Sequence, residues 1–170
     1  IFNIRLKIFF SIISLTIASG FSFFYVSKDL SKEQYNKLNR EIITNFTKAI
    51  SREPDNFLFY LERGKAKHDY GDYVGAIKDF NNSFSLKPDK KILFYKAISK
   101  YSYGDYKGAI KEYEKLTLTN IFRDQVFFNI ANSQFMLLNN AEAIENYNRS
   151  IKYDQYYENA FLNRGNAKFK

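Results

Sequence analysis

The chain has 170 residues, a formal net charge of +8 at pH 7, one histidine (His68) and no cysteine. The lack of cysteine excludes disulfides, thiol catalysis and cysteine-based metal sites. The presence of only one histidine argues against a histidine-based triad or metal centre. The lysines are scattered along the chain without an arginine cluster, which argues against nucleic-acid binding and favours attraction to acidic proteins or an anionic membrane surface.

The first predicted element is an apolar segment near the N-terminus. Residues 8–26 contain no charged side chain and consist mostly of Ile, Phe, Leu and Ser. As a helix they would extend about 28 Å at ~1.5 Å per residue, close to the ~30 Å hydrocarbon core of a bilayer. The sequence therefore predicts a transmembrane anchor over residues 8–26, preceded by a short basic tail over residues 1–7.

A cleaved signal peptide is the alternative interpretation of this segment. The tripeptide at residues 18–20, Ala-Ser-Gly, would serve as a cleavage site behind the basic tail. The apolar run continues past it to Val26, which favours a retained, single-pass anchor. Basic residues lie on both sides of the segment, so the sequence leaves open which side of the membrane carries the repeat domain.

The next predicted element is a charged helical connector over residues 27–41. This stretch contains several lysine and acidic side chains and neither proline nor glycine. Flexible linkers are usually rich in glycine and serine, so we expect a helix here that runs into the following domain.

The rest of the chain is built from repeats. Residues 71–78 return at 104–111 with a single substitution, at a shift of 33. Residues 60–67 correspond more weakly to residues 161–168, which lie three periods later. Residues 138–145 are a third, weaker copy of the octapeptide at residues 71–78. Self-similarity at a period of 20–50 residues is the sequence signature of a stacked repeat array. We therefore expect an elongated array rather than a single compact core.

Each period predicts a helical hairpin. In the first, apolar residues recur at three- and four-residue spacing, Gly71-Asp72 ends one helix and caps the next, and Pro88 closes the unit. The predicted units are a half-repeat at 42–56, full repeats at 57–89, 90–123 and 124–157, and a truncated repeat at 158–170.

Small residues recur at matched places in these units. They are Gly64, Ala97, Ala131 and Gly165 on the first helices, and Ala76, Ala109 and Ala143 on the second helices. Together with the flanking aromatic residues, the Gly-Asp-Tyr turn and the closing proline, this pattern resembles the tetratricopeptide repeat (TPR) family over residues 42–170. The resemblance implies an all-α, TPR-type helical-hairpin solenoid, preceded here by a single transmembrane or signal-like helix.

Two places depart from the family pattern. At the end of the second repeat, Leu116 stands where a small residue is expected, and no proline follows Leu118. In the third copy of the octapeptide, Leu138 replaces the turn glycine. We therefore expect altered stacking or a looser turn between the second and third repeats.

In the TPR family the first helices of the hairpins line a concave groove that binds a peptide or helix of a partner protein. The groove residues that the resemblance implies are Leu61, Lys65, His68, Asp69, Lys91, Phe94, Tyr95, Ile98, Tyr101, Gln125, Phe128, Asn129, Asn132, Asn163 and Asn166. The basic clamp with which some TPR domains hold a chaperone's acidic C-terminus is not reproduced, because Leu61 and Tyr95 stand where Lys and Asn would be needed.

These expectations describe a membrane-tethered protein-interaction scaffold that is not an enzyme and has no cofactor, metal or small-molecule substrate. Asp72 and Asp105 are explained by their turns, and His68 by a solvent-facing place in the groove. Two alternatives stay open: an exported soluble repeat protein that acts in envelope assembly after signal cleavage, and the regulatory repeat region of a larger enzyme. Because the last predicted helix would expose apolar residues, we also expect the chain to continue past Lys170.

Overall fold

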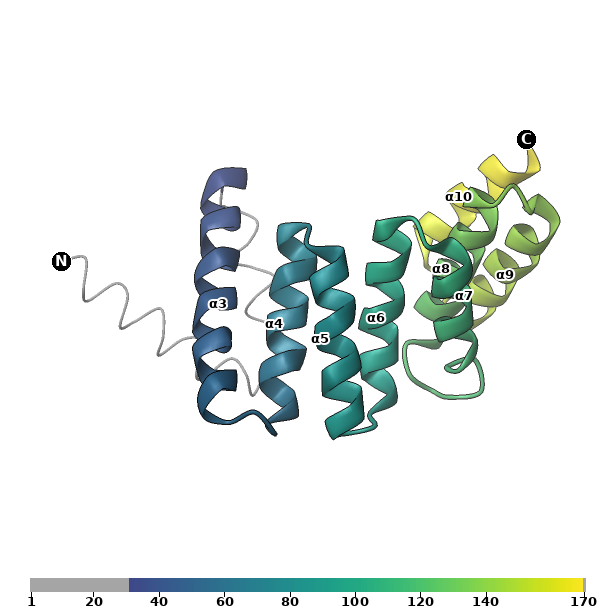
Figure 1. Ribbon diagram of the computed structural model, residues 1–170. Coiled ribbons are helices and arrows are strands. Elements are labelled where there is room, and N and C mark those ends of the chain that lie inside the picture. The colour runs from purple at the N-terminus through teal and green to yellow at the C-terminus, as the bar shows by residue number, and fades with distance from the viewer. Residues whose placement is uncertain (1–30, 170) are drawn as a thin grey trace. The chain divides into compact units, whose positions relative to one another are not determined.

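The computed structural model describes residues 31–169, and this part of the chain is helical apart from its turns (Figure 1). Its helices are α3 (Lys32–Arg52), α4 (Phe57–Tyr70), α5 (Tyr73–Leu86), α6 (Lys90–Tyr103), α7 (Tyr106–Glu114), α8 (Arg123–Met136), α9 (Asn140–Tyr153) and α10 (Glu158–Lys168). The apolar segment at residues 8–26 lies outside the described residues. None of the helices from α3 to α10 combines the length and the apolar character needed to cross a bilayer. The predicted all-α class is confirmed for residues 31–169.

The helical hairpins lie in one compact unit, Asn39–Lys170. Helix α3 begins at Lys32 and ends within this unit at Arg52. It also runs through residue 41, the predicted boundary between the connector and the half-repeat. Residues 32–52 are one continuous helix.

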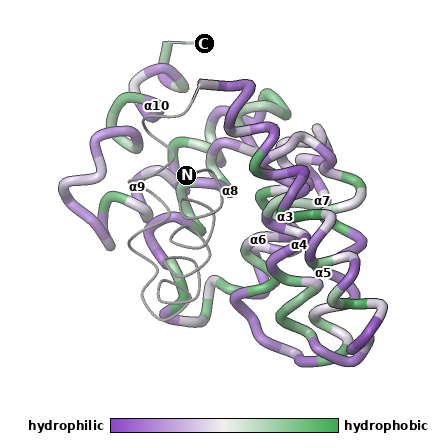
Figure 2. The backbone as a smooth tube through the Cα atoms, turned by 90° about the vertical axis from the view of Figure 1, so that its left-hand side faces the viewer, coloured by the Kyte–Doolittle hydropathy of each residue, from purple (hydrophilic) through white to green (hydrophobic). Residues whose placement is uncertain are grey.

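Helices α4 to α9 form three antiparallel hairpins, α4/α5, α6/α7 and α8/α9, and α10 follows as the first helix of a further unit (Figure 1). Each of these helices packs against its neighbour in the chain, and the first helices also contact one another: α4 with α6, α6 with α8, and α8 with α10. Hydrophobic and hydrophilic segments both occur along the tube in Figure 2, and each helix from α4 to α10 has buried as well as exposed side chains. The hairpins are therefore amphipathic units stacked side by side.

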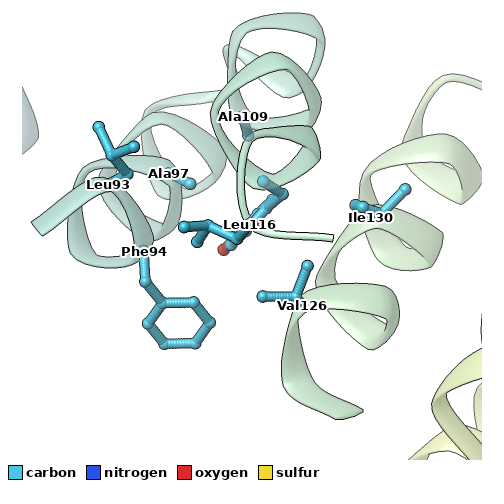
Figure 3. Packing of buried hydrophobic residues seen from close by; sticks show 8 residues of the cluster. Leu93, Phe94, Ala97, Ala109, Leu116, Val126 and Ile130 are labelled. Carbon is cyan, nitrogen blue, oxygen red and sulfur yellow. The ribbon is translucent and has the colours of Figure 1, made fainter. Parts of the chain in front are cut away.

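The core lies between successive hairpins. Among the described residues one cluster of buried side chains joins α4, α5 and α6, a second joins α6, α7 and α8, and a third joins α8, α9 and α10. Figure 3 shows the second cluster, in which Phe94 of α6, Leu116 from just after α7 and Val126 of α8 converge. Each hairpin thus depends on its neighbours to cover its apolar surface.

The Gly-Asp turns of the first two hairpins have the predicted capping geometry. Gly71 ends α4 with a left-handed φ of 95°. The Oδ1 atom of Asp72 accepts a hydrogen bond of 2.9 Å from the backbone N–H of Gly75 and so caps the start of α5. Gly104 and Asp105 repeat both features between α6 and α7. The prediction that these aspartates serve their turns is confirmed.

The second glycine of the octapeptide serves the same cap. A Cβ atom on Gly75 would overlap the carboxylate of Asp72. In the second copy of the motif, a Cβ atom on Gly108 would overlap the carboxylate of Asp105 in the same way. The third hairpin has Glu142 at this place, and there Asn139 caps α9 without a side-chain hydrogen bond. Its Nδ2 atom donates instead to Oε1 of Gln134 at 2.7 Å. The segment from Gly71 to Gly75 is therefore a helix-capping motif.

The turn of the third hairpin keeps its backbone shape although it lacks the glycine. Leu138 takes a φ of 64°, in the left-handed region. The N–H of Asn139 donates to the carbonyl of Gln134 at 2.9 Å, just as the N–H of Asp72 donates to the carbonyl of Lys67 at 2.8 Å. A looser turn is therefore not found here, and the leucine carries backbone strain instead.

Replacing Leu138 by glycine is expected to raise the free energy of unfolding by about 0.5–1 kcal/mol. A left-handed conformation costs a residue with a Cβ roughly 1–2 kcal/mol, and part of this gain is lost to the greater freedom of glycine in the unfolded chain. Little packing is lost because Leu138 is 77% exposed. Urea unfolding followed by circular dichroism measures the effect. The reciprocal change Gly71→Ala should lower stability by about 1 kcal/mol, and a loss in both variants would refute the backbone explanation.

The stack deviates at the end of the second hairpin. Helix α7 ends at Glu114 after 9 residues, whereas α5 and α9 each have 14. Leu116 stands at the place of Ser83 and Ser150 in the other hairpins, and it is fully buried in the cluster between α6, α7 and α8. Residues 115–122 then form an irregular connection to α8. The altered stacking expected between the second and third repeats takes this form.

The two serines at the place of Leu116 predict opposite mutational effects. The buried Oγ of Ser83 donates to the carbonyl of Phe57 at 2.9 Å, whereas the buried Oγ of Ser150 meets no hydrogen-bond partner within residues 31–169. Ser83→Ala should therefore cost about 1 kcal/mol, and Ser150→Ala should be neutral or stabilise by up to about 1 kcal/mol. Thermal and urea unfolding of both variants would test this, and equal losses would contradict it.

Candidate interaction surface

The predicted groove residues lie along the first helices, α4, α6, α8 and α10, and we call them the interaction row. Their exposure differs widely. Asp69, Lys91, Gln125 and Asn166 are exposed. Half-buried are Leu61, Lys65, His68, Tyr95, Ile98, Tyr101, Phe128, Asn129, Asn132 and Asn163. Phe94 is only 5% exposed and packs among the side chains of the second core cluster. It belongs to the core, so a partner cannot reach it without local opening of the stack.

The part of this row on α4 and α6 combines cationic and aromatic groups. The Nζ atom of Lys65 lies 4.8 Å from the centroid of the Tyr95 ring and 2.8 Å from Oε1 of Glu62. The Tyr95 ring in turn stacks on Phe80, with 6.1 Å between centroids. A cation held over an aromatic face is attracted by the ring quadrupole, so Lys65 is oriented rather than free. This end of the row presents a half-buried tyrosine ring with a positive charge beside it.

His68 is held within the fold. Its Nδ1 atom lies 2.9 Å from Oγ of Ser99, and its ring centroid lies 5.3 Å from that of Tyr73. Burial lowers the pKa of His68, and the nearby carboxylate of Asp69 only partly offsets this effect. The imidazole is therefore mainly neutral at pH 7. Ser99 is 0% exposed, so the pair cannot present a nucleophile to a substrate.

The asparagines of the row bind the phenol groups of the second helices. Asn129 hydrogen-bonds to the hydroxyl of Tyr113. The hydroxyl of Tyr147 donates to Oδ1 of Asn132 at 2.7 Å, and Nδ2 of Asn163 donates to the same oxygen at 3.1 Å. Burial raises the pKa of both tyrosines, that of Tyr147 to about 12. These amides satisfy buried hydroxyl groups, so only part of their bonding capacity remains for a partner.

A buried acid–base cluster that the sequence pattern did not predict joins α4 to α5. Asp79 is 1% exposed. Its carboxylate accepts hydrogen bonds from Nε and Nη2 of Arg63 at 2.8 and 2.7 Å. The Nζ atom of Lys67 lies 2.9 Å from Oδ2 of the same carboxylate. A two-pronged arginine contact with an additional lysine compensates the cost of burying this charge.

A second such cluster joins α6 to α7. Glu112 is 4% exposed, and its carboxylate oxygens lie 2.6, 2.9 and 3.3 Å from the Nζ atoms of Lys115, Lys96 and Lys100. Burial by itself would raise the pKa of Glu112, but hydrogen bonds and charge attraction from Lys115 and Lys96 outweigh it and hold the pKa at about 2. The carboxylate is therefore ionised throughout the physiological range.

The sequence did contain a signal for both clusters. Arg63 and Asp79 are 16 residues apart, and the same spacing separates Lys96 from Glu112 one period later. Both carboxylates are enclosed and fully paired, so the clusters hold the hairpins together and leave nothing for a ligand. Within residues 31–169, no three His, Asp or Glu side chains gather where a metal ion would bind.

The stacked hairpins define the class of the fold. Their period is 33 or 34 residues, small side chains stand where the helices approach, and the first helix of each hairpin contacts the first helix of the next. This is the tetratricopeptide repeat fold, which the sequence pattern predicted.

Solved structures confirm the fold. The chain is similar to MamA 41-end from Desulfovibrio magneticus RS-1, with a TM-score of 0.69 at 15% identity over 79% of this chain and 84% of that chain. It is also similar to TTC0263, a thermophilic TPR protein in Thermus thermophilus, with a TM-score of 0.61 at 13% identity over 98% and 97% of the two chains. The first TPR of Spaghetti (RPAP3), bound to the HSP90 peptide SRMEEVD, has a TM-score of 0.61 at 16% identity over 66% of this chain and 90% of that chain. No family model and no curated protein matches the sequence.

Proposed function

We propose that this protein is a membrane-tethered scaffold for protein–protein interaction, and that it binds a peptide or helix of a partner along the first helices of its hairpins. The observation that carries this proposal is the row of accessible side chains on α4, α6, α8 and α10. Their backbone is held in a stack by the turns and the acid–base clusters, so the row is a preformed surface.

The chemistry of the row changes along the stack, and this supports a partner that spans more than one hairpin. Lys65, Lys91 and Tyr95 make the first part basic and aromatic, whereas Gln125 and Asn166 make the later part neutral and polar. Exposed amides donate and accept hydrogen bonds, so they suit an extended main chain. An aromatic platform suits an apolar anchor of the partner.

The peptide in the RPAP3 structure carries two glutamates and an aspartate. A basic clamp for such a peptide is not favoured here, because Leu61 and Tyr95 occupy the places where Lys and Asn would be needed, and both pack against the cluster around Phe80. The partner class we propose is therefore a segment with apolar and polar side chains rather than an acidic C-terminus.

Site-specific photo-crosslinking on the intact protein tests the surface. A crosslinker at Lys91 or Gln125 should capture one partner, identified by mass spectrometry, while the same probe at the exposed Lys78 and Lys111 of the second helices should not. All four residues are exposed, and their side chains form no hydrogen bond or ion pair within residues 31–169, so we expect these replacements to preserve folding. Equal capture from both sets, or capture from the second helices alone, would refute the proposed surface.

The tether is tested separately. A retained anchor at residues 8–26 should leave the protein in the membrane fraction after carbonate extraction, with its N-terminus intact. Recovery in the soluble fraction with an N-terminus at Phe21 would refute the anchor and favour an exported repeat protein in envelope assembly. The outcome leaves the interaction surface untouched, because the row lies on α4 to α10.

A further inference from the structure

Exposed apolar side chains gather at the turns within the hairpins. Tyr70 and Val74 flank the α4/α5 turn, and Tyr103 ends α6 before the next turn. Met136 and Leu138 are exposed at the α8/α9 turn. The α4/α5 and α6/α7 turns lie along one edge of the stack (Figure 1). We call the three turns, residues 70–74, 103–107 and 136–140, the turn edge.

The turn edge has little charge to offset its apolar side chains. The carboxylates of Asp72 and Asp105 accept hydrogen bonds from the backbone N–H groups that start α5 and α7. Residues 134–141, around the third turn, contain no charged side chain. Asp69 and Lys107 are exposed near the first two turns and have opposite signs. This edge is therefore suited to leave water through its apolar area rather than through charge attraction.

The chain enters the compact unit beside the turn edge. The unit begins at Asn39, and the guanidinium carbon of Arg40 lies 5.3 Å from the ring centroid of Tyr70, the last residue of α4. Residues 27–31, between the predicted anchor and α3, reach at most about 20 Å at ~3.5 Å per residue. The opposite edge, formed by the connections between hairpins, lies the length of α4 away, about 21 Å for 14 residues at ~1.5 Å each. A tether at residues 8–26 would therefore hold the turn edge nearer to a bilayer than the opposite edge.

The backbone of Leu138 separates the turn edge from other exposed apolar positions. Leu138 has a φ of 64°, which is unfavourable for a residue with a Cβ, and its side chain is 77% exposed, so packing does not explain why it stands there. Leu118, at the opposite edge, is 95% exposed without a positive φ. Strained residues persist where their side chains serve a function. A leucine in place of the turn glycine therefore indicates a use for its apolar side chain.

We propose that the turn edge lies against the lipid–water interface of the membrane, with Val74, Tyr103 and Leu138 in contact with lipid. The inference rests on the proposed tether and adds an orientation of the stack to it. Tyrosine is enriched at membrane interfaces, where its ring contacts apolar groups and its hydroxyl contacts water. The tether keeps the local concentration of lipid high, so a modest apolar contact is sufficient. None of the three residues belongs to the interaction row, which remains available to a partner protein.

The test uses the 170-residue chain in phosphatidylcholine vesicles. The chain has no cysteine, so a single introduced cysteine can carry an environment-sensitive nitrobenzoxadiazole label. Labels at Val74→Cys, Tyr103→Cys and Leu138→Cys should emit at shorter wavelength with vesicles than in detergent-free buffer, and a nitroxide on the lipid acyl chains should quench them. Leu118→Cys is the matched control, because it replaces an exposed leucine at the opposite edge, and its label should show neither change.

A second variant separates lipid contact from folding. Leu138→Gly relieves the left-handed strain and is expected to stabilise the fold, but it removes one apolar contact with lipid. In the chain labelled at Tyr103→Cys, Leu138→Gly should therefore reduce quenching by the nitroxide lipid although urea unfolding shows a more stable protein. Leu118→Gly in the same labelled chain should leave the quenching unchanged.

The outcomes distinguish this inference from the tether on which it rests. Unchanged labels at the turn edge, or equal quenching at Leu118 and Leu138, in a protein that resists carbonate extraction would overturn the lipid contact and leave the tether intact. Extraction into the soluble fraction would refute the tether, and the response of the labels to added vesicles would then decide the lipid contact by itself. An emission shift that the nitroxide lipid does not quench and that grows with protein concentration would overturn it and assign the turn edge to a second copy of this chain.

Discussion

Glu112→Gln is expected to lower the free energy of unfolding at pH 7 by about 2–3 kcal/mol. The ordinary pKa near 4.5 falls to about 2 in the folded chain. Each unit of such a shift corresponds to about 1.4 kcal/mol of differential stabilisation. The variant leaves Lys96 and Lys100, whose side chains are 16% and 19% exposed, without their shared counter-charge. Partial hydration of the lysines keeps the loss below that of a fully buried pair.

The pH dependence gives the same prediction an independent readout. Because the folded-state pKa of Glu112 is depressed, its contribution is complete above about pH 4.5 and is lost as the pH falls towards about 2. Urea unfolding at pH 7 and at about pH 2.5 should therefore show a large difference between the two proteins at pH 7 and a small one in acid. Glu114→Gln, an exposed acid on the same helix, should change stability by no more than about 0.5 kcal/mol at either pH. A loss for Glu112→Gln that does not shrink in acid would refute the electrostatic origin.

Gly64→Ala is expected to destabilise the stack by about 1–2 kcal/mol. The added Cβ would lie 2.8 Å from Cε1 of Phe80, which is 1% exposed and stacked on Tyr95. Overpacking of this kind costs about 1–3 kcal/mol, and the better helix propensity of alanine returns up to about 1 kcal/mol of it.

Gly165→Ala is the matched control, with the opposite sign. No atom lies within 4 Å of a Cβ at this place, so only the helix propensity changes and stability should rise by up to about 1 kcal/mol. Thermal unfolding of both variants measures the difference. Phe80→Leu in the Gly64→Ala background should recover part of the loss, because the smaller side chain vacates the contested space. Destabilisation by both glycine changes would indicate that the clash with Phe80 is not the cause.

The local features of the fold follow from the sequence because they depend on residues close together in the chain. A turn needs a residue that tolerates positive φ, and a helix start needs a side chain that accepts a backbone hydrogen bond. Gly71 and Asp72 meet both needs within two positions, and the period of 33 or 34 residues then repeats the hairpin. Leu138 shows the limit of this argument, since its neighbours impose the left-handed conformation on a residue that disfavours it.

The interaction row was predicted less completely. The sequence places its residues on the first helices, but exposure depends on what the next hairpin covers. Phe94 is enclosed by α7 and α8, and Asn132 is bound to Tyr147 and Asn163, which stand 15 and 31 residues further along. The asparagines therefore support buried hydroxyl groups as well as lining the surface, which no local pattern reveals.

The acid–base clusters likewise depend on contacts between residues that are far apart in the sequence. In the third hairpin, Ile130 and Asn146 stand where Lys96 and Glu112 stand in the second, so the charge pair is replaced as a unit by uncharged side chains. Such paired replacement is what burial demands, because one charge left without its partner in a poorly hydrated interface costs several kcal/mol. In α10, Arg164 stands at the place of Arg63 and Lys96.

By itself the sequence determined the repeat period, the all-α class, the capped turns and the place where the stack deviates. These features rest on backbone geometry and on apolar spacing, which act over a few residues or recur at a fixed interval. Only the tertiary structure decided which side chains on the first helices are accessible, which amides are already bound and which charges are enclosed. The reason is physical, because the solvation and hydrogen-bond partners of a side chain come from neighbouring helices and hairpins. For Asn132 these partners are 15 and 31 residues away in the sequence. The octapeptide at each turn does not predict them.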